Sequence, residues 1–406
     1  MTTAVMQGVR ILEVAEHTFV PAASALLADW GAEVIKIEHV ERGDAMRGLA
    51  SSGLAIMGTS VHVLLEHSNR GKQSLGLDLA TEEGLDVLYR LAGTCDVFLT
   101  NKLPGVRSRL QIDVDDIRAH NPDIIYVQGT GQGSKGPEAD RGSYDSLAYW
   151  ARAGIAMAIK DPGDDHVSPP PAPAFGDSIG AMTIAGGIMG ALFHRAQTGE
   201  ATTVDVSLLG VGMWSMGAAL ALSLQFDRGW APPPRGTPTG NPLTGTYRTS
   251  DGRFVALSCL QATKYWPEAC EVLGFPELAS DPRFATAEAI RDNVGAATDA
   301  VRNAFASRTA DEWRTRLTGF SGQWAMVQDT LEAAQDPQAV ANGYLVDSAT
   351  ADGTPFQLAG APVQYGGEPT PTRRAPEFNE HGDAILASLG LDTETILDLK
   401  LKGVVA

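Results

Sequence analysis

Two adjacent side chains near the middle of the chain, Asp177 and Ser178, are of types that attack acyl groups. They lie in the segment FGDSIGAM at 175–182. Its Gly-Asp-Ser-Ile-Gly stretch fits the G-x-S-x-G pattern of serine hydrolases, in which the serine stands between a strand and a helix. A helical pattern follows Ser178, but the residues before it, PPPAPAF (169–175), cannot form a central strand because proline lacks the N–H donor. The surroundings therefore argue against a hydrolase that uses Ser178.

Asp177 stands at the predicted start of the same helix. Backbone N–H groups and the helix dipole favour an anion there, so we expect them to lower the pKa of Asp177 and to keep it ionised. An ionised carboxylate that faces a pocket can attack an activated acyl group and form a covalent intermediate. Aspartate is also a common helix N-cap, so the residue alone leaves a purely structural role open.

Three other patterns are candidates for a ligand-binding site: a dinucleotide fingerprint, a metal site and a basic turn. The stretch GTGQGSKG (129–136) follows a predicted strand, but PEADRG follows it where a dinucleotide fingerprint needs a helix. The eight histidines show no metal-ligand spacing, so we expect no metal site. Arg70 and Lys72 form a basic turn that could bind phosphate or could simply be solvated.

The composition limits the class of protein. The 406 residues include 31 Lys and Arg against 49 Asp and Glu, which gives a net charge of −18. That surface repels nucleic acid, and an anionic ligand would need a locally basic pocket. The three widely spaced cysteines and the absence of a signal-peptide pattern predict a cytoplasmic protein. The apolar stretches are broken by glycine and charge, so we expect no membrane span.

The first third of the chain alternates strand and helix patterns. This alternation predicts an α/β fold, with a parallel sheet covered by helices. The predicted strands are 9–15, 33–39, 96–101 and 123–129, and the predicted helices are 21–32, 81–95 and 114–121.

The rest of the chain predicts a second, smaller domain. A long helix follows Asp177, and 205–225 reads as another helix, apolar nearly all round, which predicts a buried or subunit-interface position. Turn residues at 231–242 then separate this part from an α+β region. We expect 1–225 to be a large domain, 226–334 a linker and small α+β domain, and 335–406 a return to the large domain.

Taken together, these segments resemble one family, the class III CoA-transferases of the CaiB/BaiF type. The family includes formyl-CoA and carnitine CoA-transferases and α-methylacyl-CoA racemases. The resemblance runs in order along nearly the whole chain, through 8–48, 69–79, 95–110, 124–154, 175–209, 336–346 and 373–386.

The resemblance implies a role for Asp177, because the family's catalytic aspartate lies in a Gly-Asp segment that opens a helix. In the transferases this carboxylate attacks the donor acyl-CoA thioester and forms a mixed anhydride and CoA thiolate. CoA then becomes linked to the aspartate, and the acceptor acid takes it over. Ser178 is then a bystander.

The resemblance also implies the residues that bind CoA. They are Val20, His39, Lys72, Asn101, Arg109 and Tyr144, and the glycine-containing loop that covers the site corresponds to 236–242, with Gly236 and Gly240. Lys72 and Arg109 would meet the phosphates. Asn101 would hydrogen-bond the pantetheine or adenine side.

Two departures from the family pattern bear on substrate and reaction. Pro21 stands where formyl-CoA transferase has glutamine, and His39 where it has arginine, which makes a small oxalate-type substrate doubtful. Tyr144 stands in or beside the position of the racemases' histidine. A racemase needs two acid/base groups on opposite faces of the α-carbon, so this favours CoA transfer. An acyl-CoA racemase or isomerase using Asp177 as acid/base, and a CoA-binding protein without activity, remain alternatives.

The resemblance implies an intertwined homodimer with a Rossmann-like large domain and a smaller α+β domain. It implies acyl-CoA and a carboxylic acid as substrates, with no metal or redox cofactor and no nucleic-acid or membrane partner. The acyl group and the acceptor acid are not apparent from the sequence.

Overall fold

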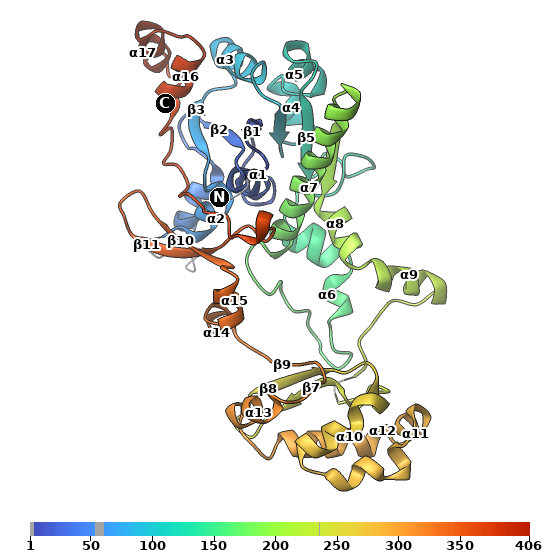
Figure 1. The fold of residues 1–406 in the computed structure, drawn as a ribbon. Coiled ribbons are helices and arrows are strands. Elements are labelled where there is room, and N and C mark those ends of the chain that lie inside the picture. Colours follow the sequence, from blue (N-terminus) through green and yellow to red (C-terminus); the bar gives the residue numbers. More distant parts are fainter. Residues whose placement is uncertain (1–3, 53–60, 235) are drawn as a thin grey trace. The chain divides into compact units, whose positions relative to one another are not determined.

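The computed structural model describes residues 4–52, 61–234 and 236–406, and it describes residues 49–52 by their backbone only. The chain forms two compact units. The first, called the large unit below, consists of Met1–Pro232 together with Gln338–Ala406, and the second consists of Pro233–Pro337. Figure 1 shows both ends of the chain in the large unit.

A six-stranded parallel sheet forms the centre of the large unit, in the order β3-β2-β1-β4-β5-β6. This is the strand order of Rossmann-like folds, and the order reverses between β1 and β4. The predicted α/β class is confirmed. The strands are β1 (Arg10–Val14), β2 (Glu33–His39), β3 (Gln73–Leu77), β4 (Val97–Thr100), β5 (Ile125–Thr130) and β6 (Thr203–Ser207).

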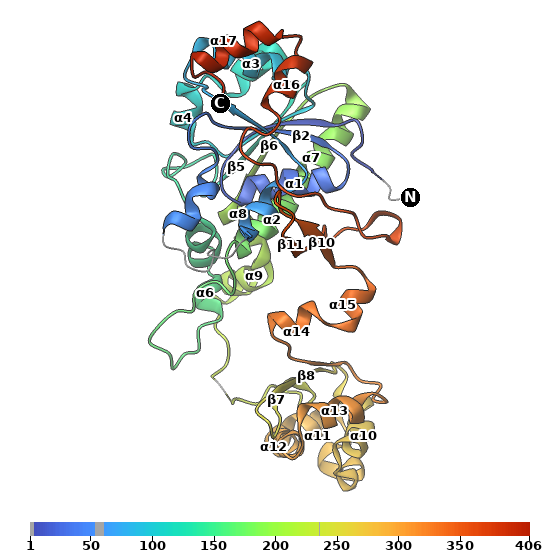
Figure 2. The same ribbon diagram turned by 90° about the vertical axis from the view of Figure 1, so that its left-hand side faces the viewer.

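Helices cover both faces of this sheet because successive side chains of its strands point to opposite faces. Ile11 packs in the core beneath α1 and α7, and Leu12 packs in the core beneath α3, α5, α16 and α17. Figure 2 shows the two helical layers on either side of the strands. The helices are α1 (Phe19–Asp29), α7 (Phe175–Thr198), α3 (Glu82–Ala92), α5 (Val114–His120), α16 (Gly382–Ser388) and α17 (Thr393–Leu401).

Helix α7 carries Asp177 in its first turn and packs closely on its neighbours because it has glycine there. A Cβ atom at Gly176 would lie 2.6 Å from the Tyr149 ring, and one at Gly180 would lie 2.3 Å from the Phe19 ring of α1. Helix α7 is also long and apolar enough to cross a membrane by length and composition. It contacts α1, β5 and β6, as a sheet-covering helix does.

The prediction of one continuous helix over 205–225 is wrong. Strand β6 occupies the start of this segment, and two helices, α8 (Leu208–Ser215) and α9 (Gly217–Phe226), follow with a bend of 72° between them. The strand pairs with β5, and this tertiary contact overrides the apolar helix-like pattern. Trp214 and Leu224 are 86% and 85% exposed, so these helices present apolar side chains on the large unit's surface.

The remaining elements of the large unit are shorter. They are η1 (Ala45–Ser52), α2 (Val63–Asn69), α4 (Pro104–Arg109), the π-helical turn η3 (Ser146–Arg152), α6 (Ile155–Ala158), the antiparallel pair β10 (Leu345–Ala349) and β11 (Pro355–Ala359), and η6 (Tyr365–Gly367). Between α6 and α7, residues 159–174 form the predicted proline-rich loop.

The second unit has its own core around an antiparallel sheet with the order β7-β8-β9. Trp266, Phe305 and Trp313 fill that core. The elements are β7 (Thr244–Arg248), β8 (Phe254–Ser258), α10 (Ala262–Leu273), η4 (Pro276–Ser280), η5 (Pro282–Phe284), α11 (Ala287–Asp292), α12 (Val294–Phe305), α13 (Ala310–Leu317), β9 (Trp324–Met326) and α14 (Thr330–Ala334), with α15 (Pro337–Ala341) at the return to the large unit.

Candidate active site

A pocket of about 420 Å³ lies at the carboxyl ends of the strands in the large unit. This is the crevice where ligands bind in open parallel sheets, because the strand order reverses between β1 and β4. Its lining comes from the turn after β1 (Glu16, His17, Phe19), the segment after β4 (Asn101, Lys102, Leu103), the end of β5 (Gly129, Thr130, Gly131), the loop at 142–144 and Asp177 of α7.

The environment of Asp177 differs from the expected one. Burial and the nearby Asp145 carboxylate raise the pKa of Asp177 to about 7, whereas the helix start was expected to lower it. Burial is the larger cause, and Asp145 adds to it because its Oδ2 accepts the hydrogen bond of the Gly176 N–H at 3.1 Å, which places a second carboxylate at the helix terminus. The Asp177 carboxyl group makes no hydrogen bond or ion pair with the residues that the structure describes. A carboxyl group near its pKa at neutral pH faces the pocket.

Ser178 does not line the pocket, and its hydroxyl group is hydrogen-bonded to a neighbouring carbonyl. Its Oγ donates to the Ala174 carbonyl at 2.9 Å and lies 3.4 Å from His67 Nε2. Burial and the charge of Arg70 lower the pKa of His67 to about 4. Ser178 lies in the first turn of α7, and a turn in which Ala174 has φ +56° precedes this helix, so the strand that a nucleophile elbow needs is missing from this part of the described chain.

Three basic residues line both this pocket and an adjoining one of about 270 Å³. Arg42, Lys102 and Arg109 belong to both linings. Arg42 and Arg109 are exposed and form no ion pair with the described residues, whereas Lys102 Nζ lies 2.9 Å from Glu16 Oε2. In a chain with a net charge of −18, this is a local basic region that suits phosphate groups.

Sequence reasoning missed Arg42 and Lys102. The signal that could have found them is their position a few residues beyond the predicted strand ends at 39 and 101, at the edge of the sheet where ligands bind.

Four of the expected CoA-binding residues line these two pockets. His39 lies in the smaller pocket, Arg109 in both, and Asn101 and Tyr144 in the larger one. The Tyr144 ring is 60% exposed and stands edge-on to the His17 ring, with the centroids 5.6 Å apart.

The side-chain amide of Asn101 is already engaged at both ends. Its Oδ1 accepts from the Glu16 N–H at 3.1 Å, and its Nδ2 donates to the Glu16 carbonyl at 2.7 Å. In this structure Asn101 holds the turn after β1, a different task from the expected hydrogen bond to CoA.

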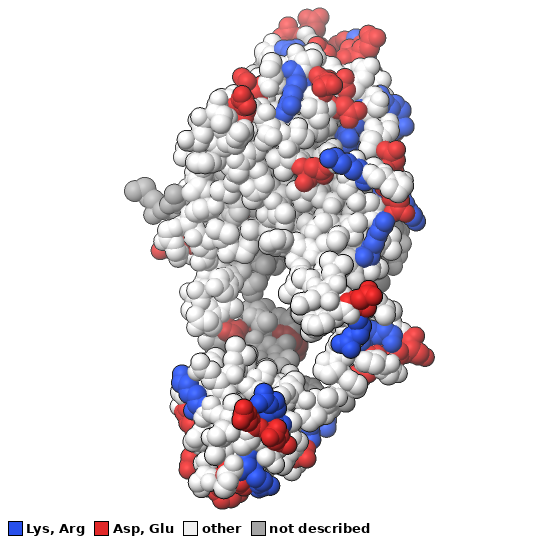
Figure 3. Space-filling model, turned by 90° about the vertical axis from the view of Figure 1, so that its right-hand side faces the viewer, with Lys and Arg blue, Asp and Glu red and all other residues white. Residues whose placement is uncertain are grey.

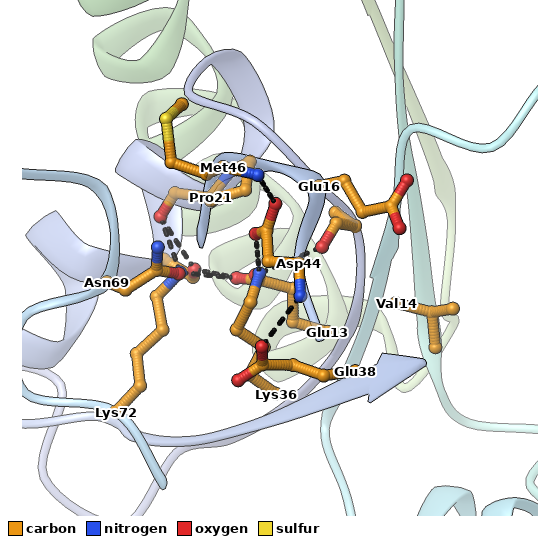
Figure 4. Close-up of polar contacts among 12 residues, drawn as sticks. Glu13, Val14, Glu16, Pro21, Lys36, Glu38, Asp44, Met46, Asn69 and Lys72 are labelled. Atoms are coloured by element: carbon orange, nitrogen blue, oxygen red, sulfur yellow. Dashed lines mark hydrogen bonds and ion pairs between the residues drawn. The ribbon is translucent and has the colours of Figure 1, made fainter. Parts of the chain in front are cut away.

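The structure places Val20 and Lys72 outside these two pockets, and their part in CoA binding stays a prediction. The Val20 side chain is fully buried in the core, and His17 and Phe19 line the pocket from the same turn. Lys72 Nζ is fully buried and donates to Glu13, Pro21 and Asn69, so all its protons are used, as Figure 4 shows. Burial, partly offset by Glu13, lowers the pKa of Lys72 to about 7. In this structure the ammonium group is therefore bonded entirely within the chain.

Gly236 and Gly240 lie in the coil before β7 in the second unit, where Gly236 has φ +80°. Their part in the site stays a prediction. In the described ranges, no group of three or more His, Cys, Asp or Glu side chains is arranged to hold a metal ion.

Comparisons with known proteins place this geometry in context. The profile of CoA-transferase family III matches residues 6–382. The (R)-2-hydroxy-4-methylpentanoate CoA-transferase of Clostridioides difficile is 29% identical over 399 residues, which cover 97% of this chain and 98% of that protein. The cinnamoyl-CoA:phenyllactate CoA-transferase of Clostridium sporogenes is 28% identical over 402 residues, with 98% and 96% covered. A crystal structure of an aspartate-to-alanine mutant of Rv3272 from Mycobacterium tuberculosis has a TM-score of 0.78 at 28% identity, with 94% of this chain and 98% of that chain covered.

Proposed function

The chain belongs to CoA-transferase family III, and from this premise we propose that it transfers CoA through a covalent intermediate on Asp177. The resemblance inferred from the sequence is thereby confirmed, and the named homologues are CoA-transferases. The observation that carries the proposal is the Asp177 carboxyl group, which faces a pocket continuous with the basic region of Arg42, Lys102 and Arg109.

In the proposed reaction the ionised Asp177 attacks the thioester carbonyl of the donor. The C–S bond breaks, CoA leaves as the thiolate, and an aspartyl–acyl anhydride forms. The thiolate then attacks the aspartyl carbonyl, which releases the donor carboxylate and leaves CoA bound to Asp177 as a thioester. The acceptor carboxylate repeats these two steps in reverse, which forms the new acyl-CoA and returns the aspartate.

The basic region supports the proposal because CoA carries phosphate groups. Arg42 and Arg109 offer guanidinium groups that are free of ion pairs to the described residues, and guanidinium groups bind phosphate through charge-assisted hydrogen bonds. We assign the diphosphate to these two residues. His39 lines the smaller pocket together with these two residues.

The pocket also suggests a substrate class. Phe19, Leu103, Val106 and Leu208 give it an apolar wall. The two relatives named above act, by their names, on (R)-2-hydroxy-4-methylpentanoate and phenyllactate, acids with a branched or an aromatic substituent. We propose that the acyl group transferred here is likewise medium to large and apolar.

A racemase or isomerase remains a second candidate because of one observation. A carboxyl group with a pKa near 7 suits proton transfer, and His17 in the same pocket supplies a second acid/base group that the sequence comparison did not identify. Exchange of the α-hydrogen of an acyl-CoA with solvent deuterium would distinguish this chemistry from transfer.

We further propose a cytoplasmic homodimer. Helices α7, α8 and α9 of the large unit carry exposed apolar side chains, namely Phe193, Met213, Trp214, Leu224 and Phe226. Figure 3 shows a face of the large unit on which uncharged side chains predominate over a broad area. Exposed large apolar side chains on a face with few charges are typical of protein–protein interfaces. The three cysteines are all free and buried, as suits a reducing compartment.

Mass spectrometry tests the covalent step. The protein is incubated with a panel of acyl-CoAs that includes branched, aromatic and dicarboxylic acyl groups, with and without hydroxylamine. We expect an acyl or CoA adduct on the peptide of Asp177 in the wild type and in Ser178→Ala, and none in Asp177→Ala. Transfer of CoA without any adduct, or an adduct that survives in Asp177→Ala, would refute the proposal.

A further inference from the structure

A buried group of charges lies directly beneath the turn that lines the pocket. Glu13 of β1 holds two ammonium groups, with its Oε1 2.8 Å from Lys36 Nζ and its Oε2 2.8 Å from Lys72 Nζ. All three side chains are 0% exposed. Asp44 joins them through its Oδ2, which lies 2.8 Å from Lys36 Nζ. We call Glu13, Lys36, Asp44 and Lys72 the buried cluster, and Figure 4 shows its contacts.

The buried cluster is bonded to the backbone of the turn between β1 and α1. Lys36 Nζ donates to the Ala15 carbonyl at 2.8 Å, and Lys72 Nζ donates to the Pro21 carbonyl at 2.8 Å. These carbonyls bracket residues 16–20, of which Glu16, His17 and Phe19 line the pocket. The two lysines therefore hold both ends of the segment that forms one wall of the site.

The middle of the same turn is held as well. Asp44 Oδ1 accepts from the His17 N–H at 3.0 Å and from the Met46 N–H at 2.8 Å. Asn101 bonds both backbone groups of Glu16 from the side. His17 has φ +69°, a left-handed conformation that a non-glycine residue keeps only where its surroundings determine it.

Stability alone does not account for such a cluster. Desolvation of charges is expensive, and apolar residues can often replace a buried ion pair without loss. If the buried cluster instead fixes the position of the turn between β1 and α1, this explains why its charged groups are hydrogen-bonded to carbonyl and N–H groups of that turn. The side chain that the turn presents to the pocket at its strained residue is His17, whose ring meets only Tyr144 among the described aromatic rings. Its imidazole nitrogens form no hydrogen bond with the described residues, so they are available to a substrate.

We propose that the buried cluster is a positioning device that holds His17 in its left-handed conformation, so that the imidazole contacts the acyl group during CoA transfer. This inference rests on the proposed function of Asp177. Asp44 and Asn101 act through His17 and are positioning residues, whereas His17 touches the substrate.

A double-mutant cycle tests it. Asp44→Asn keeps the shape of the side chain and removes the charge that faces Lys36. Asn101→Ala removes the lateral hydrogen bonds without stranding a buried charge, so it carries the test if Asp44→Asn fails to fold. Each change is made in the wild type and in His17→Asn, since asparagine tolerates a positive φ. CoA transfer is measured as kcat and KM, together with thermal unfolding.

We expect each change to lower kcat/KM by about fivefold or more in the wild type, mostly through kcat, and by less than about twofold in His17→Asn. A residue that acts only on stability would give the same factor in both backgrounds. Equal factors, or wild-type kcat/KM in folded Asp44→Asn and Asn101→Ala, would overturn the proposal.

Asp29→Asn is the matched control. Asp29 forms an equally buried ion pair with Arg70 at 2.8 Å, but it does not contact the turn. We expect Asp29→Asn to lower the unfolding temperature and to change kcat/KM by the same factor in the wild type and in His17→Asn. A factor that differs between these two backgrounds would overturn the proposal. The adduct experiment separates the two failures, because this inference can fail while Asp177 still forms its adduct in the wild type.

Discussion

Asp145→Asn should shift the pH dependence of catalysis toward acid. Asp145 does two things at the start of α7, since its Oδ2 accepts from the Gly176 N–H and its charge raises the pKa of Asp177. Asparagine keeps an oxygen for the hydrogen bond and removes the charge. The substitution therefore changes the electrostatics of Asp177 with little change to the helix terminus.

The size of the shift follows from the causes of the raised pKa. The pKa of Asp177 rises from 3.8 to about 7, which corresponds to about 4 kcal/mol of preference for the protonated form. Burial is the larger cause and Asp145 the smaller, so less than half of this belongs to Asp145. We expect Asp145→Asn to lower the pKa of Asp177 by about one unit, or about 1.4 kcal/mol.

The assay is the pH profile of kcat/KM, which reports ionisation in the free enzyme. The nucleophile must be ionised, so the wild-type profile should rise with a midpoint near pH 7. In Asp145→Asn the midpoint should lie about one unit lower, so that the variant is roughly fivefold faster than the wild type at about pH 6 and similar at about pH 8.5. Asp140→Asn, an exposed carboxylate in the same loop, is the control and should leave the midpoint unchanged.

Two results would refute the reasoning. A midpoint that stays where it is in correctly folded Asp145→Asn would show that Asp145 does not set the ionisation of Asp177. A profile that falls rather than rises through pH 7 would show that the protonated acid is the active form, as a racemase acting by general acid catalysis would require.

Three further predictions concern stability and CoA binding. Because the pKa of Asp177 is raised in the folded state, the fold loses stability as the pH rises from about 4 to about 7. Above pH 7, Asp177→Asn should therefore raise the free energy of unfolding by about 1–2 kcal/mol, after discounting for partial exposure, and should unfold at a higher temperature. Below pH 4 it should show no gain. Calorimetry at the two pH values checks this, and an equal gain at both would contradict it. Arg42→Ala and Arg109→Ala should each raise KM for acyl-CoA by roughly fivefold to tenfold with little change in kcat. Neither change should affect KM for a pantetheine thioester, which lacks the phosphates. Equal losses for both substrates would disprove the phosphate assignment. Gly180→Ala should destabilise the protein by about 1–3 kcal/mol in thermal unfolding and lower kcat, because its Cβ would lie 2.3 Å from a ring of α1 and displace the start of α7. Gly186→Ala in the same helix has open space and should be neutral or stabilising by up to about 1 kcal/mol, so similar losses for the two would argue against a packing cause.

The sequence alone was sufficient where the deciding interactions are local. The alternation of apolar strands and helices predicts the parallel sheet, and β1, β2, β4 and β5 lie within two residues of their predicted bounds. Asp177 was found at a helix start for the same reason, because helix-forming residues follow a proline-rich loop. The ordered resemblance along the chain was enough to identify the family.

Tertiary structure decided what depends on residues far apart in the chain. The pKa of Asp177 rises because burial desolvates it and Asp145, 32 residues earlier, occupies the helix terminus, which no local pattern shows. Lys72 reads as a phosphate-binding turn residue, yet the fold encloses it with Glu13 and turns its charge toward the backbone. Its partners meet it only when β1, β2 and β3 lie side by side, so their roles follow from strand order rather than from sequence spacing.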